Sequence, residues 1–165
     1  MKRIINYSFF FIVAAFVVIY ACKNDTVTNS PSSTTSLYSK LGGYKAIDTV
    51  VAVFINNVVA DDSVNFFFGG VLSDTTGTRY RSLRQNLVQQ ICMASGGPCV
   101  YMGKDMRTAH GGMNITIGQF SALVNDLVAS MTTLGVSQQN RNDLLAILGP
   151  LCHDIVANGS GTGCP

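Results

Sequence analysis

The chain has 165 residues, of which 47% are hydrophobic and 12% charged, and this is room for one compact domain with short appendages. The formal net charge is +2, and it falls to 0 once the first 21 residues, which carry Lys2 and Arg3 and no acid, are removed. A neutral chain has no basic field to attract nucleic acid, so we expect no nucleic-acid partner.

The first 21 residues are typical of a secretory signal. A short basic start precedes an almost wholly apolar run from Ser8 to Ala21, which is short for a spanning helix of ~20 apolar residues. The end of this run, Ile19-Tyr-Ala-Cys22, resembles a bacterial lipobox, with Tyr20 bulkier than is usual there. The resemblance implies cleavage before Cys22, acylation of Cys22 and anchoring to a membrane on the periplasmic or cell-surface side. An uncleaved signal anchor is the alternative.

Residues 22–36 predict a lipidated cysteine followed by a flexible tether, because Asn, Asp, Thr, Ser and Pro leave almost nothing to bury. The folded domain is expected over residues 37–157, and residues 158–165 form a Gly- and Ser-rich tail. No convincing period-2 strand appears in the sequence, so the expected fold class is all-α.

The first half of the domain begins with a short helical turn that Gly42 and Gly43 close. Apolar residues then recur at helical spacing to about Ala60, which predicts an amphipathic helix. Three consecutive Phe follow at 66–68, and they cannot all face one small core, so at least one should meet something flat and apolar. The polar residues 71–78 predict a loop.

The second half is expected to hold three more helical segments. Leu83, Leu87 and Ile91 form a stripe in a helix from about Thr78 to Ser95. A capping box, Thr116-Ile-Gly-Gln119, starts the next helix. Ser137 is a plausible N-cap of the last helix, and Pro150 predicts a kink or an early end in it.

His110 is one of only two histidines, and Gly111 and Gly112 follow it directly. A neutral imidazole is a common ligand for a transition metal or a haem iron, and glycines allow a sharp turn or a close approach to a flat partner. A lone histidine is, however, more often a helix-end or surface residue.

The order of these features resembles a truncated haemoglobin of the first group over about residues 36–157. The resemblance implies an all-α, two-over-two helical sandwich around haem b (iron protoporphyrin IX). The matching stretches are Ser36-Leu-Tyr-Ser-Lys-Leu-Gly-Gly43, Phe67-Phe68, Gly96-Gly-Pro98, Tyr101-Met-Gly103, Met106-Arg-x-x-His110, Ile115-Thr116, Phe120 and Gly149-Pro-Leu151.

The resemblance also assigns roles to residues. His110 matches the proximal iron ligand, Phe68 the Phe that packs on the haem ring, and Met106 a position on the proximal side. The residues expected at the haem are Phe54, Ile55, Phe67, Phe68, Leu83, Leu87, Ile91, Tyr101, Met106, Ile115 and Phe120.

The distal positions depart from the family pattern. Oxygen-holding members usually carry a Tyr where this chain has Ile55, and often a Gln where counting back from Gly96 without a gap places Leu83 and Leu87. An apolar distal pocket offers no hydrogen-bond donor to a gas ligand, which favours CO or NO over oxygen. A two-residue shift in the preceding loop would instead bring Gln85 into the pocket. Other donors within reach, unless they lie on a solvated helix face, are Tyr80, Gln89 and Gln90.

Four cysteines remain after Cys22, and an exported chain meets an oxidising compartment, so disulfides are expected. Three pairings are possible, of which we prefer Cys92–Cys99, across the Gly-Gly-Pro turn, and Cys152–Cys164. Redox-active thiols or a cysteine metal site are the alternative, but no CxxC motif supports them. The second histidine, His153, is expected at the surface and paired with Asp154, with a buried role as the alternative.

These features support three hypotheses. The first is a lipid-anchored haem protein that binds O2, NO or CO reversibly. The second is a haem enzyme that oxidises NO to nitrate or acts as a weak peroxidase, which requires an as yet unidentified reductant and is favoured by a distal donor. The third is haem carriage or electron transfer outside the cytoplasm. Whether the chain is an enzyme stays open at this point.

Overall fold

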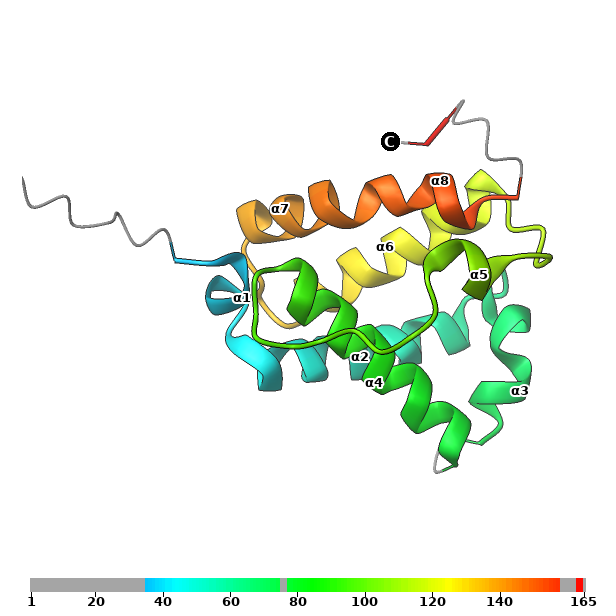
Figure 1. Ribbon diagram of the computed structural model, residues 1–165, viewed down its shortest axis with the longest axis horizontal. Coiled ribbons are helices and arrows are strands. Elements are labelled where there is room, and N and C mark those ends of the chain that lie inside the picture. Colours follow the sequence, from blue (N-terminus) through cyan, green and yellow to red (C-terminus); the bar gives the residue numbers. More distant parts are fainter. Residues whose placement is uncertain (1–34, 75–76, 158–162, 165) are drawn as a thin grey trace, which may run out of the picture. The chain divides into compact units, whose positions relative to one another are not determined.

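The computed structural model describes residues 35–74, 77–157 and 163–164 (Figure 1). The chain divides into two units, Met1–Ser33 and Thr34–Pro165, and the described residues all belong to the second. The expected signal peptide at 1–21, the lipidated Cys22 and nearly all of the tether therefore lie outside the described residues, as does most of the tail at 158–165.

The described residues form helices and no strand, as the sequence predicts. In chain order the elements are α1 (Leu37–Lys40), α2 (Gly43–Ala60), the 3₁₀ helix η1 (Asn65–Phe68), α3 (Gly69–Leu72), α4 (Thr78–Ala94), α5 (Met106–His110), α6 (Ile117–Thr133), α7 (Gln138–Leu148), the 3₁₀ helix η2 (Gly149–Leu151) and α8 (Cys152–Ile155).

Local sequence signals set several of these boundaries. The Ser36 side chain caps α1 by accepting from the backbone N–H of Ser39. Gly42 and Gly43 then adopt φ values of 90° and 74°, a left-handed conformation that glycine tolerates best. This pair turns the chain from α1 into α2, and the predicted glycine closure is confirmed.

The predicted loop over residues 71–78 is shorter in the structure. η1 continues directly into α3, which takes up Val71 and Leu72, and Ser73 closes this turn by donating its backbone N–H to the carbonyl of Gly69. The sequence did not predict this turn because Val71 continues no long apolar stripe. Its side chain instead lines the cavity described below.

The predicted boundaries of the last helices are confirmed. Thr116 and Gln119 form the full capping box of α6, and the Ser137 side chain caps α7. Pro150 lies in η2, a single 3₁₀ turn that separates α7 from α8. A proline lacks the backbone N–H that an uninterrupted helix needs, so the last helix is broken where the sequence predicts it.

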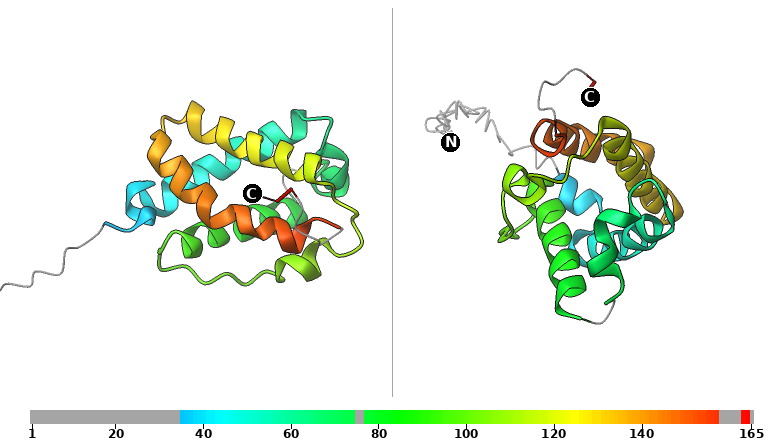
Figure 2. Two further views of the ribbon diagram at one scale, coloured as in Figure 1. Left: turned by 90° about the horizontal axis from the view of Figure 1, so that it is seen from above. Right: turned by 90° about the vertical axis from the view of Figure 1, so that its right-hand side faces the viewer.

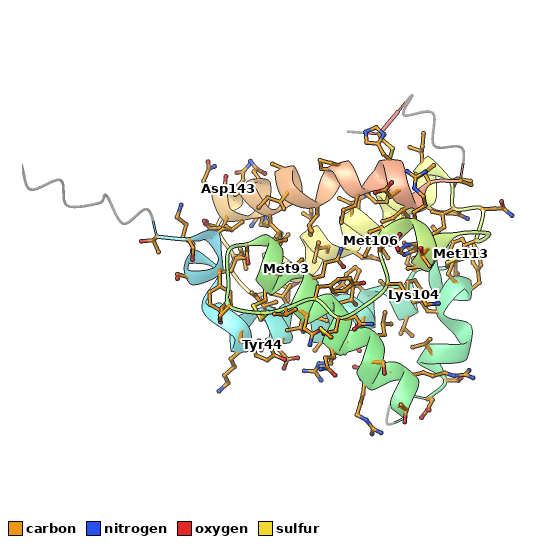
Figure 3. The ribbon with its side chains drawn as sticks, viewed as in Figure 1. Tyr44, Met93, Lys104, Met106, Met113 and Asp143 are labelled. Atoms are coloured by element: carbon orange, nitrogen blue, oxygen red, sulfur yellow. A yellow bond between two sulfur atoms is a disulfide. The ribbon has the colours of Figure 1, made fainter. Side chains whose placement is uncertain are left out.

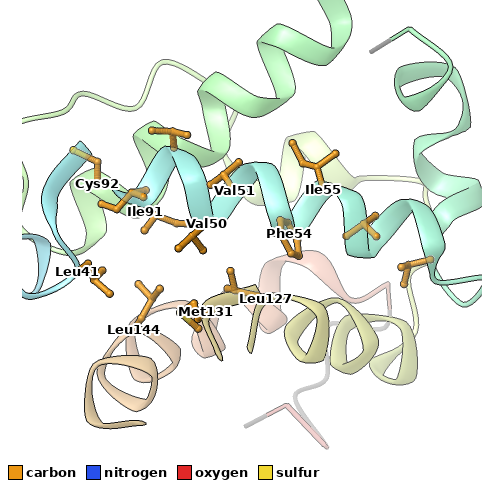
Figure 4. Close-up of a cluster of buried hydrophobic side chains, with 14 residues drawn as sticks. Leu41, Val50, Val51, Phe54, Ile55, Ile91, Cys92, Leu127, Met131 and Leu144 are labelled. Carbon is orange, nitrogen blue, oxygen red and sulfur yellow. The ribbon is translucent and has the colours of Figure 1, made fainter. Parts of the chain in front are cut away.

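α2 lies between two neighbours, α4 and α6, and carries much of the core (Figures 1 and 2). α2 and α4 make one helical pair, and α6 with α7 and α8 makes the other. The core side chains come from all of these long helices (Figure 4). They include Ile47, Val50, Val51, Phe54, Ile55 and Val58 of α2, Val88, Ile91 and Cys92 of α4, Leu127 and Met131 of α6, and Leu144 of α7.

None of the described helices is by itself long and apolar enough to cross a membrane, although α2 taken together with residues 65–71, at a bend of 115°, reaches that length and composition.

Candidate functional site

A mostly apolar cavity of about 470 Å³ opens between α4, α5 and the start of α6. Its volume is in the range of small-molecule and cofactor sites. The lining comprises Val64, Phe67, Phe68, Val71, Leu83, Asn86, Leu87, Gln90, Tyr101, Lys104, Met106, Ala109, His110, Met113, Ile115, Gln119, Phe120, Leu123 and Ile155.

A second hollow of about 290 Å³ adjoins this cavity on the side of the core. The two share the side chains of Leu87, Gln90, Met106, His110, Phe120, Leu123 and Ile155. The inner hollow adds Phe54 of α2 and Ile91 of α4, together with leucines of α6, α7 and η2. We treat both as one site with a partly polar outer chamber and an apolar inner one.

One face of α4 forms a wall of the outer chamber. Leu83, Asn86, Leu87 and Gln90 all line it, and residues separated by three, four and seven positions lie on the same face of a helix. This placement agrees with counting back from Gly96 without a gap. The alternative register is wrong, because Gln85 is exposed and does not line the chamber.

α5 is a helix of only five residues that places His110 at its C-terminal end. Asp105 caps it by accepting from the backbone N–H of Thr108 at 2.9 Å. Hydrogen bonds from the side chain and backbone of Thr108 hold the pKa of Asp105 below its usual value. The helix ends at His110 with Gly111 as its C-cap, and Gly112 follows with a φ of 81°. The two glycines thus turn the chain away directly after the histidine.

His110 is half-buried, and its Nδ1 lies 2.8 Å from the carbonyl oxygen of Met106. Because a carbonyl oxygen only accepts, the neutral form of the ring that makes this hydrogen bond carries its hydrogen on Nδ1 and has its lone pair on Nε2. An imidazole held in this way is ready to ligate a metal through Nε2. Figure 3 shows Met106, Met113 and Lys104 around this short helix.

Most residues that the sequence singles out meet at this site. Phe67, Phe68, Leu83, Leu87, Tyr101, Met106, Ile115 and Phe120 line the outer chamber, and Phe54 and Ile91 line the inner one. Ile55 is the exception, since it lines neither chamber and is only 3% exposed within the core. Successive residues of a helix point about 100° apart, so α2 presents Phe54 to the inner chamber and turns Ile55 into the core.

The three consecutive Phe behave as their number predicts. Phe66 is 59% exposed, and its ring centroid lies 4.3 Å from that of Phe67. Phe67 and Phe68 are both half-buried and line the outer chamber. Phe67 and Phe68 therefore face the cavity, whereas Phe66 lies at the surface.

Of the four donors considered near the distal wall, Gln90 alone lines the site. Its Nε2 donates to Sδ of Met106, another lining residue, at 3.5 Å. Gln89 instead accepts from the backbone N–H of Met102 at 3.4 Å, and Tyr80 packs against the core. The sequence reasoning missed Asn86, which follows from its spacing to Leu83 and Gln90 on one helix face.

Lys104 and Tyr101 place polar groups at the outer chamber from the segment before α5. The Tyr101 hydroxyl donates to the carbonyl of Lys104 at 2.8 Å. Burial and, less strongly, the negative charge of Asp105 raise the pKa of Tyr101. Lys104 is the one cationic lysine or arginine residue among the described residues that line this mostly apolar chamber. No spacing rule in the sequence pointed to Lys104.

The second histidine lies outside both chambers. His153 is exposed as expected, and it lines a separate polar hollow of about 180 Å³ together with Arg107 and one edge of His110. Asp154 does not pair with its neighbour as expected. Its carboxylate accepts from Arg107 at 2.5 Å, which ties α5 to α8.

Both preferred disulfides are present in the structure. Cys92 at the end of α4 bonds to Cys99, and Cys152 in α8 bonds to Cys164. The Cα atoms of each pair are 5.7 Å apart. Thiolate metal ligation by these four cysteines is therefore ruled out in this oxidised form.

Within the part of the chain that the structure describes, no group of three or more His, Cys, Asp or Glu side chains could hold a metal ion. A protein-only zinc site needs at least three such ligands. His110 offers one nitrogen beside an apolar chamber, and this arrangement fits a metal that arrives in an organic macrocycle, as in haem.

Comparisons with known proteins agree with this geometry. The family model for bacterial-like globins matches residues 36–157. Group 1 truncated hemoglobin GlbN of Mycolicibacterium paratuberculosis is 31% identical over 126 residues, which cover 76% of this chain and 88% of that protein. The Group 1 truncated hemoglobin of Tetrahymena thermophila is 36% identical over 104 residues, covering 63% and 80%.

Two solved structures extend the likeness to three dimensions. The truncated hemoglobin of Tetrahymena pyriformis in its Fe(III) form aligns with a TM-score of 0.66 and 30% identity, covering 74% of this chain and 98% of that one. The 2/2 hemoglobin of Synechococcus sp. PCC 7002, in the cyanomet state and with covalently attached heme, aligns with a TM-score of 0.64 and 31% identity, covering 73% and 98%.

Proposed function

Because the chain belongs to the group 1 truncated haemoglobins, within the bacterial-like globin family, we propose that it binds haem b in the cavity beside α5, with His110 as the iron ligand, and that it binds diatomic gases there. The observation that carries this proposal is the single half-buried imidazole whose Nδ1 is held by the Met106 carbonyl. Ferrous haem b supplies an iron with a coordination position for O2, NO or CO.

The residues of the site fit haem on three counts. The walls are mostly apolar, with Phe67, Phe68 and Phe120 available to pack on a flat ring and to exclude water. His110 keeps its Nε2 for iron, and the Met106 carbonyl fixes the orientation and the tautomer of the ring. Lys104 supplies a cation for the carboxylates that haem carries at its edge.

The α4 wall decides which gas is preferred. Leu83 and Leu87 present only carbon atoms to the outer chamber. Ile55, which stands where oxygen-holding members usually carry a Tyr, is packed in the core. A donor to a partly charged oxygen contributes roughly 1.5–3 kcal/mol. Because these three side chains provide no hydrogen-bond donor, oxygen should dissociate quickly, and binding of CO or NO should be favoured.

A second function is supported by the two amides on the same wall. Asn86 and Gln90 both line the outer chamber, and the Gln90 side chain donates a hydrogen bond to a thioether sulfur, which is a weak acceptor. An amide that turns toward the gas would retain oxygen, and retained oxygen is what oxidation of NO to nitrate requires. This enzymatic alternative, or a weak peroxidase activity, also needs an external reductant.

The proposed location is outside the cytoplasm, with the chain anchored in a membrane through acylated Cys22. The support is the apolar run at residues 9–21, the lipobox-like end of that run, and the two disulfides, which are typical of exported proteins. Metabolic labelling with a radioactive fatty acid tests the anchor, since the wild-type chain should be labelled and Cys22→Ser should not.

The gas-binding proposal is tested by optical spectroscopy of the full chain in detergent after haem addition. We expect a stoichiometric Soret band, a ferrous form that binds CO, and rapid oxygen dissociation. A slow oxygen dissociation rate that accelerates in Gln90→Leu would instead favour the enzymatic alternative. The absence of a stoichiometric Soret band would overturn the proposal.

A further inference from the structure

Residues 98–105 form an extended segment, here called the strap, that runs from the end of α4 back along that helix to the start of α5 (Figures 1 and 2). The strap brings Tyr101 and Lys104 to the outer chamber, and its last residue, Asp105, caps α5. One wall of the cavity and the helix that carries His110 are therefore both attached through this segment.

Two of the apolar side chains of the strap bury little surface. Val100 is 67% exposed and Met102 is 77% exposed, so neither side chain anchors the segment to the domain. α5 has only five residues, and a helix of that length does not persist without support. The strap on one side, and the ion pair of Arg107 with Asp154 of α8 on the other, thus hold the position of His110.

Non-covalent ties between α4 and the strap are few. The amide N–H of Gly97, just before the strap, donates to the Cys92 carbonyl at 2.8 Å. Farther along, the backbone N–H of Met102 donates to Gln89 at 3.4 Å, which is longer than the usual hydrogen-bond distance. The covalent tie is the disulfide between Cys92 and Cys99.

We propose that the Cys92–Cys99 disulfide is a redox latch, which keeps the strap on α4 and retains haem while it is oxidised, and which releases both when a dithiol reduces it. The proposal rests on the proposed haem binding for its consequence, but the opening of the strap can be measured without haem. It assigns to this bridge a control of cofactor retention beyond its part in the fold.

The two sulfur atoms differ in exposure to solvent, and this difference determines which one the reductant attacks. Cys92 is 0% exposed, and the backbone of Gly97 covers its sulfur, since a Cβ on Gly97 would lie 2.7 Å from that atom. Cys99 is partly exposed. A thiolate of the dithiol attacks Sγ of Cys99, the S–S bond breaks, and Cys92 leaves and takes up a proton.

The second thiol of the reductant then attacks its own sulfur in the mixed disulfide and releases Cys99. In sum the protein disulfide gains two electrons and two protons, and the dithiol becomes a cyclic disulfide. Reduction leaves Cys92 as a neutral thiol in an apolar site, which suits a small hydrophobic side chain, so the domain should stay folded while the strap is freed.

The second disulfide provides a matched control. Cys152 is also 0% exposed, but neither it nor Cys164 belongs to the strap or lines either chamber. We compare two double variants, Cys92→Ala/Cys99→Ala and Cys152→Ala/Cys164→Ala. Each removes one fully buried sulfur and one partly exposed sulfur. They differ in whether the strap loses its covalent tie.

Haem loss from the full chain in detergent is measured by transfer to excess apomyoglobin. The bridge joins residues seven apart in sequence. For a loop of this length, loss of the bridge should raise the equilibrium constant for opening of the strap by up to about seventyfold. We expect haem loss to accelerate at least about tenfold in the Cys92/Cys99 variant and less than about threefold in the Cys152/Cys164 variant. Equal rates for both variants, or no acceleration in the first, would overturn the latch.

Two further measurements guard against misfolding and against failure of the haem proposal. The Cys152/Cys164 variant treated with dithiothreitol, which is then removed under nitrogen, opens the first bridge without substituting it and should also lose haem faster. In the haem-free chain, amide hydrogen exchange over residues 97–105 should accelerate on reduction while that of α2 does not. Unchanged exchange of the strap would refute the latch, whereas a missing Soret band would refute haem binding alone.

Discussion

Replacing Leu87 by Gln is expected to slow oxygen dissociation from the haem-loaded chain. Leu87 lines both chambers of the site, and a Gln side chain there would place an amide donor at a position that now offers only carbon atoms. A hydrogen bond to a partly charged oxygen contributes roughly 1.5–3 kcal/mol, and at about 1.4 kcal/mol per factor of ten this slows release roughly 10- to 150-fold.

The assay is stopped-flow displacement of oxygen by CO, with the CO stretching frequency as a second reading of the local polarity. Leu87→Met is the matched control, because it keeps an apolar side chain of similar volume and should leave the rate within about threefold of the wild type. Gln85→Leu, at an exposed position on the same helix, should change nothing. If Leu87→Gln left both the rate and the frequency unchanged, the assignment of this face of α4 to the gas would be refuted.

Three predictions concern the fold around the site. Gly97→Ala places a Cβ 2.5 Å from a tyrosine ring and 2.7 Å from the buried disulfide sulfur, so it should cost about 1–3 kcal/mol in urea unfolding, whereas Gly118→Ala meets nothing closer than 3.9 Å and should not. Burial and, secondarily, the charge of Asp61 raise the pKa of Asp126 in the folded chain. Ionisation of this carboxyl group therefore lowers the free energy of unfolding as the pH rises above its pKa in the unfolded chain. Asp126→Asn should raise the thermal midpoint at pH 7 and leave it unchanged at pH 3, and the opposite ranking would contradict this. Thr116→Ala removes the N-cap of α6 and should cost about 1 kcal/mol by the same urea assay; a loss below a few tenths would mean that the capping box is dispensable.

Much of the helical framework was predictable, because its signals are local. The glycine pair at 42–43, the capping box at Thr116 and the break at Pro150 each act within one helical turn. The pairing Cys92–Cys99 is similarly close in sequence. His110 could be singled out as an isolated imidazole followed by glycines, and the family resemblance supplied its role.

The rest depended on how helices rotate and pack, which a single sequence does not specify. Ile55 and Phe54 are adjacent, and only the packing of α2 decides that Phe54 lines the inner chamber while Ile55 lies in the core. The partner of Asp154 is Arg107, which is 47 residues away, so the neighbouring histidine was the wrong choice. Lys104 reaches the cavity because the strap runs along α4, a path that no periodicity reveals.

The central claim is that His110 ligates haem iron, and an optical spectrum of His110→Gly with and without added imidazole tests it most directly. The wild-type chain should show a stoichiometric Soret band and a five-coordinate ferrous form. The variant should lose this spectrum and regain it when free imidazole fills the space of the missing ring. A variant that keeps the wild-type ferrous spectrum without imidazole, or a wild-type chain that shows no stoichiometric Soret band, would contradict the account.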